Sequence, residues 1–242
     1  MRLAPPTVVR RSTLALVGLV ALVGCGVPAN DAAPVTIDLG VGLGVVGHPG
    51  EVGTEGQVAA NASDIDSVVM IGDSITKGST PALLDRFDLL GLDTMIQAEN
   101  GKRMAVSVPD NPSGATIAGF LESGSDDHSN ELWVVALGTN DVGQYSSPDE
   151  IAAAVNEVLD GVPDESPLVW VDTYFRDRPE AQAVLNSIVH DRVIRRGNSV
   201  VAPWSSFATA DVLVADGVHP TPDGTEVFAF VVTDTARAFL GL

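Results

Sequence analysis

The chain has 242 residues, of which 45% are hydrophobic, 5% aromatic and 19% charged, enough for one well-packed domain with attached segments. Its 13 lysine and arginine residues against 32 aspartate and glutamate residues give a formal net charge of −19. Such a surface repels phosphates, so the composition argues against a nucleic-acid partner.

Residues 1–24 have the pattern of an export signal peptide. Arginines precede an apolar run, Leu14 to Val23, that is too short to span a bilayer as a mature helix. The run ends in Leu22-Val23-Gly24-Cys25, which resembles the lipobox of bacterial lipoproteins, where the cysteine is acylated and becomes the new N-terminus. Cys25 is the only cysteine of the chain, so an internal disulfide is excluded. The alternative is an ordinary secretory leader that contains an incidental cysteine.

Residues 25–63 predict a tether. They are rich in Gly, Ala, Pro and Val, carry few charges and contain no Phe, Trp or Tyr. If flexible, about 38 such residues would span roughly 35 Å, enough to hold a domain away from a membrane surface.

From Asp64 onward, apolar strand patterns alternate with helical patterns. The predicted strands cover residues 68–71, 94–98, 133–137, 167–173 and 199–202. The predicted helices cover residues 81–90, 113–121, 148–159 and 179–195, with a closing helix after residue 223. This alternation predicts one domain over residues 64–242, an α/β fold with a mainly parallel sheet covered by helices on both faces.

Three of these strands end in polar loops with candidate catalytic groups. Ser74 follows the first strand and is a candidate nucleophile. Gly101 follows the second strand, where an unobstructed N–H can stabilise an oxyanion, and Asn140 follows the third and can donate its side-chain amide. Taken singly, each is also an ordinary turn residue. Because parallel strands end at one edge of a sheet, we expect the three to converge.

The loop Asp216-Gly217-Val218-His219-Pro220 supplies a candidate base. An aspartate three residues before a histidine can fold its carboxylate onto Nδ1, which leaves Nε2 to face a serine hydroxyl. Pro220 keeps His219 out of helical geometry. By contrast, Asp126-Asp127-His128 lie adjacent on one loop and make a poor metal site, so no metal is expected.

Together these residues resemble the SGNH (GDSL-type) hydrolase family, whose sequence blocks contribute a Ser, a Gly, an Asn and a His in that order. Gly72-Asp73-Ser74-Ile75 matches the first block, with Ile in place of the customary Leu. Gly138-Thr139-Asn140-Asp141 matches the third block and the loop at residues 216–220 matches the fifth, while Gly101 fits the second by spacing. The resemblance covers residues 64–242 and implies a three-layer α/β/α sandwich of the flavodoxin-like type.

The resemblance also implies a site and a reaction. Ser74 would be the nucleophile, His219 the general base and then acid, and Asp216 the residue that orients the imidazole. The N–H groups of Ser74 and Gly101 and the side chain of Asn140 would form the oxyanion hole, with no metal or organic cofactor. The reaction would be hydrolysis of a carboxylic ester through an acyl-enzyme. The substrate would be a small molecule or an envelope glycan or lipid carrying a short acyl or acetyl group.

Several alternatives stay open. The acyl-enzyme could pass its acyl group to a glycan hydroxyl, since the segment around Gly101-Lys102-Arg103 resembles envelope acyltransferase-like branches of the family. An alternative that is not an enzyme is a catalytically silent envelope-binding lipoprotein. The intact set of Ser, His and Asp argues against this alternative. For location, we expect lipid anchoring through Cys25 to the outer face of the bacterial cell membrane, with plain secretion as the alternative.

Overall fold

The computed structural model describes residues 58–242, apart from residue 126. The predicted signal peptide, the lipobox with Cys25 and most of the predicted tether lie outside the described residues. None of the helices within the described part of the chain is long and apolar enough to cross a membrane.

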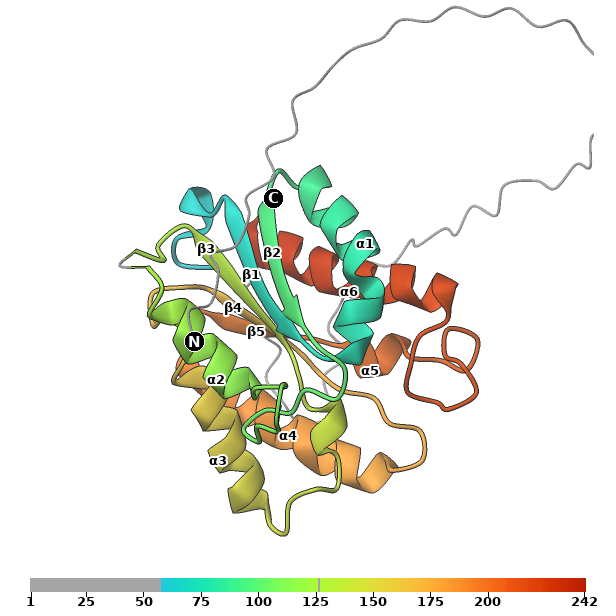
Figure 1. The fold of residues 1–242 in the computed structure, drawn as a ribbon. Helices are drawn as coiled ribbons and strands as arrows, with labels where there is room; N and C mark the ends of the chain where they lie inside the picture. The colour runs from blue at the N-terminus through green and yellow to red at the C-terminus, as the bar shows by residue number, and fades with distance from the viewer. Residues whose placement is uncertain (1–57, 126) are drawn as a thin grey trace, which may run out of the picture. The chain divides into compact units, whose positions relative to one another are not determined.

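Five parallel strands form one sheet, as the alternating pattern predicted (Figure 1). The spatial order is β2-β1-β3-β4-β5, and every neighbouring pair is parallel. The strands are β1 (Ser67–Gly72), β2 (Asp93–Ala98), β3 (Glu131–Ala136), β4 (Leu168–Val171) and β5 (Ser199–Ala202).

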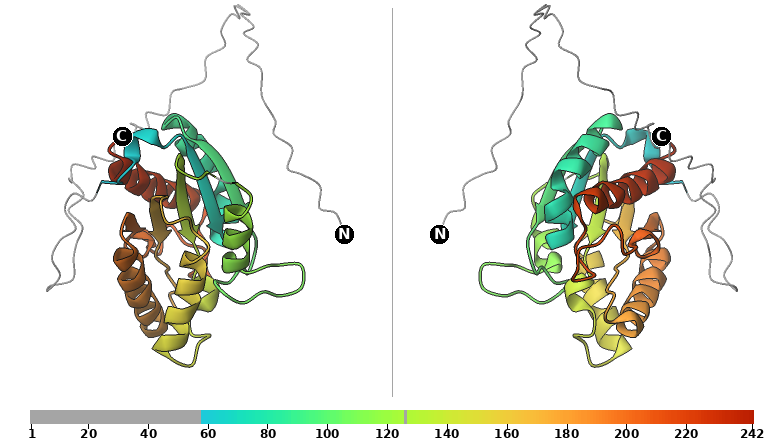
Figure 2. Two further views of the ribbon diagram at one scale, coloured as in Figure 1. Left: turned by 90° about the vertical axis from the view of Figure 1, so that its left-hand side faces the viewer. Right: turned by 90° about the vertical axis from the view of Figure 1, so that its right-hand side faces the viewer.

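Helices cover both faces of this sheet. They are α1 (Ser74–Leu89), α2 (Gly114–Glu122), α3 (Pro148–Leu159), α4 (Pro179–Arg196), the short α5 (Trp204–Phe207) and α6 (Pro222–Leu240), with 3₁₀ turns η1 (Ala62–Asp64) and η2 (Thr139–Asp141). Figure 2 shows α1 and α6 side by side on one face, while α2, α3 and α4 lie on the other. The predicted three-layer α/β/α architecture is therefore confirmed.

Strands β1, β3 and β4 each contribute to two hydrophobic cores because successive side chains point to opposite faces. In β1, Val68 and Met70 join the core beneath α1 and α6, whereas Val69 and Ile71 join the core beneath α2, α3 and α4. All four side chains are at most 4% exposed. A strand buried on both faces explains the continuous apolar run in the sequence rather than an alternating one.

The helix after β1 begins at Ser74 and not at Pro81, so that sequence-based boundary was wrong. The carboxylate of Asp73 accepts the Ile75 N–H at 2.9 Å and caps the new helix. Pro81 lies inside α1, where it gives up one backbone hydrogen bond, although a proline is more typical of the first turn. The consequence is that Ser74 stands at the helix N-terminus.

The first described residues, 59–61, bond to the domain at the amino ends of the strands. Ala59 N–H donates to the Phe239 carbonyl at 2.8 Å, and Ala60 N–H donates to Asn198 Oδ1 at 2.9 Å, just before β5. Asn61 Nδ2 donates to the Ser129 carbonyl, shortly before β3, at 2.8 Å. Packing on the domain therefore begins upstream of Asp64, at the edge of the sheet opposite to the carboxyl ends of the strands.

Candidate active site

The structure brings Ser74 and His219 into contact across a separation of 145 residues. Ser74 is the first residue of α1, immediately beyond the carboxyl end of β1, and His219 lies in the loop before α6. Ser74 Oγ lies 2.9 Å from His219 Nε2. This distance permits direct transfer of the hydroxyl proton to the imidazole, the geometry that a serine nucleophile requires.

Asp216 orients the imidazole from within the same loop. Its Oδ2 lies 2.8 Å from His219 Nδ1, and its Oδ1 accepts the N–H groups of Val218 at 2.9 Å and His219 at 3.0 Å. Desolvation opposes ionisation of the carboxyl, but the hydrogen bonds from His219 and Val218 outweigh it and lower the pKa of Asp216 to about 2. The carboxylate is thus ionised at neutral pH and holds the tautomer with Nε2 free to accept a proton.

The loop that carries Asp216 and His219 is braced by the segment after β4. Arg176 N–H donates to the Gly217 carbonyl at 3.2 Å, and the Arg176 guanidinium donates to the Ala215 carbonyl. Gly217 has φ +68°, and a Cβ at this position would lie 2.7 Å from Arg176 Cβ. A glycine is therefore needed both for the left-handed backbone and for the close approach of Arg176.

Asn140 has both protons of its side-chain amide engaged within the protein, and its role as an oxyanion donor stays a prediction. It sits in η2, beyond the carboxyl end of β3, and its Nδ2 donates to Asp73 Oδ2 at 3.3 Å and to the Lys102 carbonyl at 3.1 Å. Asn140 thereby links the residue before Ser74 to the residue after Gly101. The loops that follow β1, β2 and β3 therefore converge at one edge of the sheet. They lie next to the β1–β3 pair, where the chain order of the strands changes direction across the sheet.

Gly101 lies in the turn after β2 with φ +71°, a conformation that favours glycine. A Cβ built there would meet nothing within 4 Å, so the position faces open space. Among the described residues, no hydrogen-bond acceptor is assigned to the Gly101 N–H. The group is thus free to meet a substrate oxygen, and its role in an oxyanion hole stays a prediction.

Two buried aspartates of the site were not singled out from the sequence. Asp73 is 2% exposed and bonds both Ile75 N–H and Asn140 Nδ2, while Asp141 is fully buried and bonds the segment after Gly101. The capping position of Asp73, one residue before a helix, was a usable signal. Asp141 offered none, because its partners Arg103 and Met104 lie 38 and 37 residues away in the sequence.

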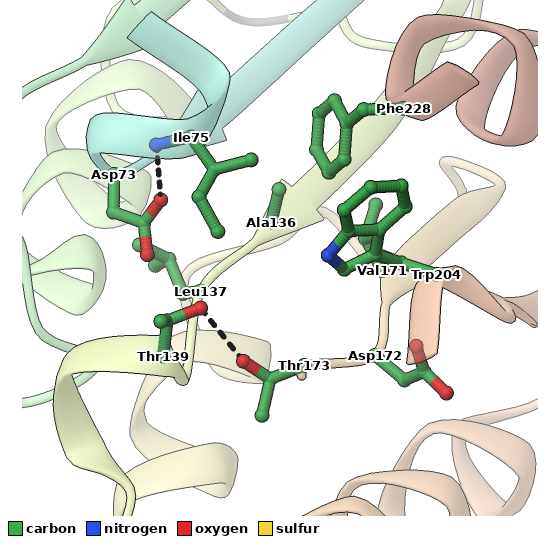
Figure 3. A pocket seen from close by; sticks show the side chains of 10 residues that line it. All are labelled: Asp73, Ile75, Ala136, Leu137, Thr139, Val171, Asp172, Thr173, Trp204 and Phe228. Atoms are coloured by element: carbon green, nitrogen blue, oxygen red, sulfur yellow. Dashed lines mark hydrogen bonds between the residues drawn. The ribbon is translucent and has the colours of Figure 1, made fainter. Parts of the chain in front are cut away.

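A small cavity lies beside Asp73 and Ile75, and Trp204 of α5 and Phe228 of α6 line its other side (Figure 3). Its lining includes the carboxyl of Asp73, the hydroxyl pair Thr139–Thr173 at 2.7 Å, and the indole of Trp204. Desolvation by burial raises the pKa of Asp73 to about 6, although the Ile75 N–H and the charge of His219 oppose the rise. With a volume of about 10 Å³, the cavity is too small for an acyl chain.

No cluster of three metal-ligating side chains occurs among residues 58–125 and 127–242. His128 belongs to the loop that the sequence analysis considered as a metal site. Both of its ring nitrogens have a hydrogen-bond partner within the protein. Nδ1 lies 2.7 Å from Glu131 Oε2, and Nε2 lies 2.8 Å from the Glu122 carbonyl. This histidine therefore fastens its loop to α2 and β3.

Comparison with solved structures agrees with the fold. The C-terminal catalytic domain of peptidoglycan O-acetyltransferase A from Streptococcus pneumoniae is 18% identical, with TM-score 0.51, over 73% of this chain and 93% of that one. An aryl esterase of M. smegmatis is 14% identical, with TM-score 0.58, over 72% and 99%. A family two carbohydrate esterase from Cellvibrio japonicus is 15% identical, with TM-score 0.55, over 76% and 62%. At these identities the likeness shows the fold alone.

No curated protein matches this chain significantly. A family model does: that of the GDSL-like lipase/acylhydrolases matches residues 70–227, a span that begins inside β1, ends inside α6 and contains Ser74, Gly101, Asn140, Asp216 and His219. Because this match covers more than half of the chain and agrees with the fold, the protein belongs to the GDSL-like lipase/acylhydrolase family of SGNH serine hydrolases.

Proposed function

We propose that this protein is a serine esterase that hydrolyses carboxylic esters with short acyl or acetyl groups through an acyl-enzyme on Ser74. The observation that carries the proposal is the continuous chain from Ser74 Oγ through His219 to Asp216, with hydrogen-bond distances of 2.9 and 2.8 Å. Such a chain makes a serine hydroxyl nucleophilic and leaves an acid ready for the leaving group.

The proposed reaction uses each group in turn. His219 Nε2 takes the Ser74 proton as Oγ bonds the ester carbon, and the carbonyl oxygen becomes an oxyanion. The N–H groups of Ser74 and Gly101 stabilise this charge, and the Asn140 amide joins them by exchanging its 3.3 Å contact with Asp73 Oδ2 for the oxyanion. The Ser74 N–H is available because a first helical residue has no intrahelical acceptor. His219 then protonates the departing alcohol. A water, deprotonated by the same imidazole, releases the carboxylic acid and regenerates Ser74.

The substrate class in this proposal is an acylated small molecule or envelope glycan. Support comes from the fold-level neighbours, which include a carbohydrate esterase, an aryl esterase and an O-acetyltransferase acting on peptidoglycan. The O-acetyltransferase among these neighbours favours an acetyl or another short acyl group.

Transfer of the acyl group to a glycan hydroxyl is the second candidate function. The specific observation in its favour is the match to the catalytic domain of peptidoglycan O-acetyltransferase A, together with the resemblance of the Gly101-Lys102-Arg103 segment to acyltransferase-like branches. The two reactions share the acyl-enzyme and differ in the acceptor. Product analysis with a soluble glycan present, which separates released acid from acylated glycan, distinguishes them.

The test of the proposed function is a chain-length series of aryl esters assayed beside acetylated glycans, with Ser74→Ala as the blank. We expect hydrolysis of the short esters and covalent labelling of Ser74 by a fluorophosphonate probe. A wild-type chain that neither hydrolyses any ester nor labels would instead be the silent envelope-binding module, and the proposal would be abandoned.

We also propose that the protein is exported and anchored to the outer face of the bacterial cell membrane through lipids on Cys25. Two acyl chains suffice for stable attachment, whereas one is marginal. The first described residues pack at the amino ends of the strands, whereas Ser74 stands beyond the carboxyl end of β1. Mass spectrometry of the native N-terminus tests this. An unmodified Cys25, or a mature end downstream of it in membrane-free protein, indicates secretion.

A further inference from the structure

Asp141 is a fully buried carboxylate with three donors around it. Its Oδ1 accepts Arg103 Nε at 3.1 Å and the Tyr145 hydroxyl at 2.8 Å, and its Oδ2 accepts the Met104 N–H at 3.0 Å. The side chain of Asp141 is 0% exposed and that of Arg103 is 23% exposed. A buried charge is tolerated only when it is paired and hydrogen-bonded, and here both oxygens are satisfied.

These bonds join two of the loops that converge on the site. Asn140 Nδ2 donates to the Lys102 carbonyl at 3.1 Å, so Asn140 and Asp141 together hold Lys102, Arg103 and Met104. The held residues directly follow Gly101. The position of the Gly101 N–H relative to the Asn140 amide is therefore set by three hydrogen bonds between these loops, and Asp141 accepts two of them.

The same segment is held from its other side. Lys102 is 4% exposed, and its ammonium donates to Asn111 Oδ1 at 3.1 Å and to the Pro112 carbonyl at 2.7 Å. The Arg103 guanidinium also stacks over the Tyr145 ring at 5.4 Å. Lys102 therefore ties the turn after β2 to the segment before α2, while Asp141 ties the same turn to η2.

We propose that Asp141 is the positioning residue of the oxyanion hole, which fixes the Gly101 turn against Asn140. This inference rests on the proposed ester chemistry at Ser74. The physical reason is that oxyanion donors act by being held in place before the charge develops, so misplacement of about 1 Å can cost 10²-fold in rate. Arg103 neutralises the carboxylate, so the buried negative charge does not oppose the oxyanion.

The decisive variant is Asp141→Asn. Asparagine has the same size as aspartate but only one acceptor oxygen. Its NH₂ group is a donor, so it would face either the Met104 N–H or the Arg103 and Tyr145 donors and leave them without an acceptor. We expect kcat to fall about 10- to 100-fold with little change in KM, because the hole acts in the transition state. The rate of inactivation by the fluorophosphonate probe should fall in parallel.

A matched control separates positioning from stability. Ser166 is fully buried and its hydroxyl donates to the His128 carbonyl at 2.9 Å, near the amino ends of the strands. Ser166→Ala should lower the melting temperature and leave kcat unchanged. In the Asn140→Ala background, Asp141→Asn should cost less than in the wild type, because one donor that it positions is already gone.

The proposal is overturned if folded Asp141→Asn keeps the wild-type kcat and loses only thermal stability, as Ser166→Ala does. Should Asp141→Asn fail to fold, Tyr145→Phe decides: a lower kcat at unchanged KM supports the proposal, and a wild-type kcat overturns it. Failure of the proposed function is recognised separately, because the wild type itself would then show neither hydrolysis nor labelling above the Ser74→Ala blank.

Discussion

At the scale of single residues, the site consists of polar groups whose partners are already in place. Ser74, His219 and Asp216 form one hydrogen-bonded chain, and Asn140 is held between Asp73 and Lys102. Preorganisation of this kind lowers the reorganisation needed when charge develops. Each member should therefore affect catalysis more than substrate binding.

Asn140→Ala tests the oxyanion donor. We expect kcat to fall roughly 10²–10³-fold, the scale for one such donor, with a much smaller change in KM. A turn-forming asparagine would instead lower the melting temperature and leave kcat nearly intact in the folded fraction. Measuring kcat, KM and the thermal midpoint on the same preparation decides between these outcomes.

Asp216→Asn tests the orienting carboxylate. An asparagine can still cap the loop N–H groups through its oxygen, but its amide cannot hold the same imidazole tautomer, so we expect kcat to fall by about 10²-fold or more. The pKa of Asp216 is lowered to about 2, so the carboxylate stays ionised down to pH 4. Loss of wild-type activity on acidification to pH 4 should therefore not arise from protonation of Asp216. A fully active Asp216→Asn variant would assign the orienting role elsewhere.

At the scale of elements, the loop at residues 216–220 depends for its shape on Arg176, which lies in the segment after β4. Gly217 has φ +68° and is in close contact with Arg176, whereas Gly197, at the end of α4, has φ +71° and open space around its Cβ position. The two glycines thus share a positive φ, which disfavours residues with a Cβ, and differ in surroundings. This pair provides an internal comparison for the packing of Arg176.

Gly217→Ala and Gly197→Ala should both be destabilised by about 1–3 kcal/mol, because a positive φ strains any residue that carries a Cβ. Only Gly217→Ala should lose activity, because the new methyl group displaces Arg176 and disturbs the peptides on both sides of Asp216. Denaturant unfolding and kcat of both variants provide the measurement. Equal kcat values in the two variants would show that the contact with Arg176 does not shape the site.

At the scale of the whole molecule, two carboxyls near the sheet edge make stability depend on pH. Desolvation raises the pKa of Asp73 to about 6, against the Ile75 N–H and the charge of His219. Desolvation also raises the pKa of Asp172 to about 6, against the two hydrogen bonds from Ser205. In both cases the native state binds protons that the unfolded chain has released. Between about pH 4 and 6 these groups therefore lower the free energy of unfolding as pH rises.

Asp172→Asn should remove one of these two contributions. One pKa unit corresponds to about 1.4 kcal/mol. The free energy of unfolding of the wild type minus that of the variant should therefore fall by up to about 3 kcal/mol between pH 4 and pH 6. Above pH 6 the difference should be constant. Urea unfolding of both proteins across this range provides the test, and parallel curves would contradict the assignment.

The sequence by itself determined the order of the elements, the layer architecture and the local pair Asp216 and His219. These features depend on residues a few positions apart: apolar runs, caps, and an aspartate placed to bond a histidine three residues later. It also indicated Ser74, Asn140 and Gly101, because the carboxyl ends of parallel strands must meet.

Only the tertiary structure decided which polar groups support the site. Asp141 meets Arg103 across 38 residues, and Asn140 meets Asp73 across 67 residues. Such contacts depend on strand order, on loop conformation and on the start of α1 at Ser74 instead of Pro81. No local pattern encodes them, because each bond forms only after the sheet has brought the ends of β1, β2 and β3 to one edge.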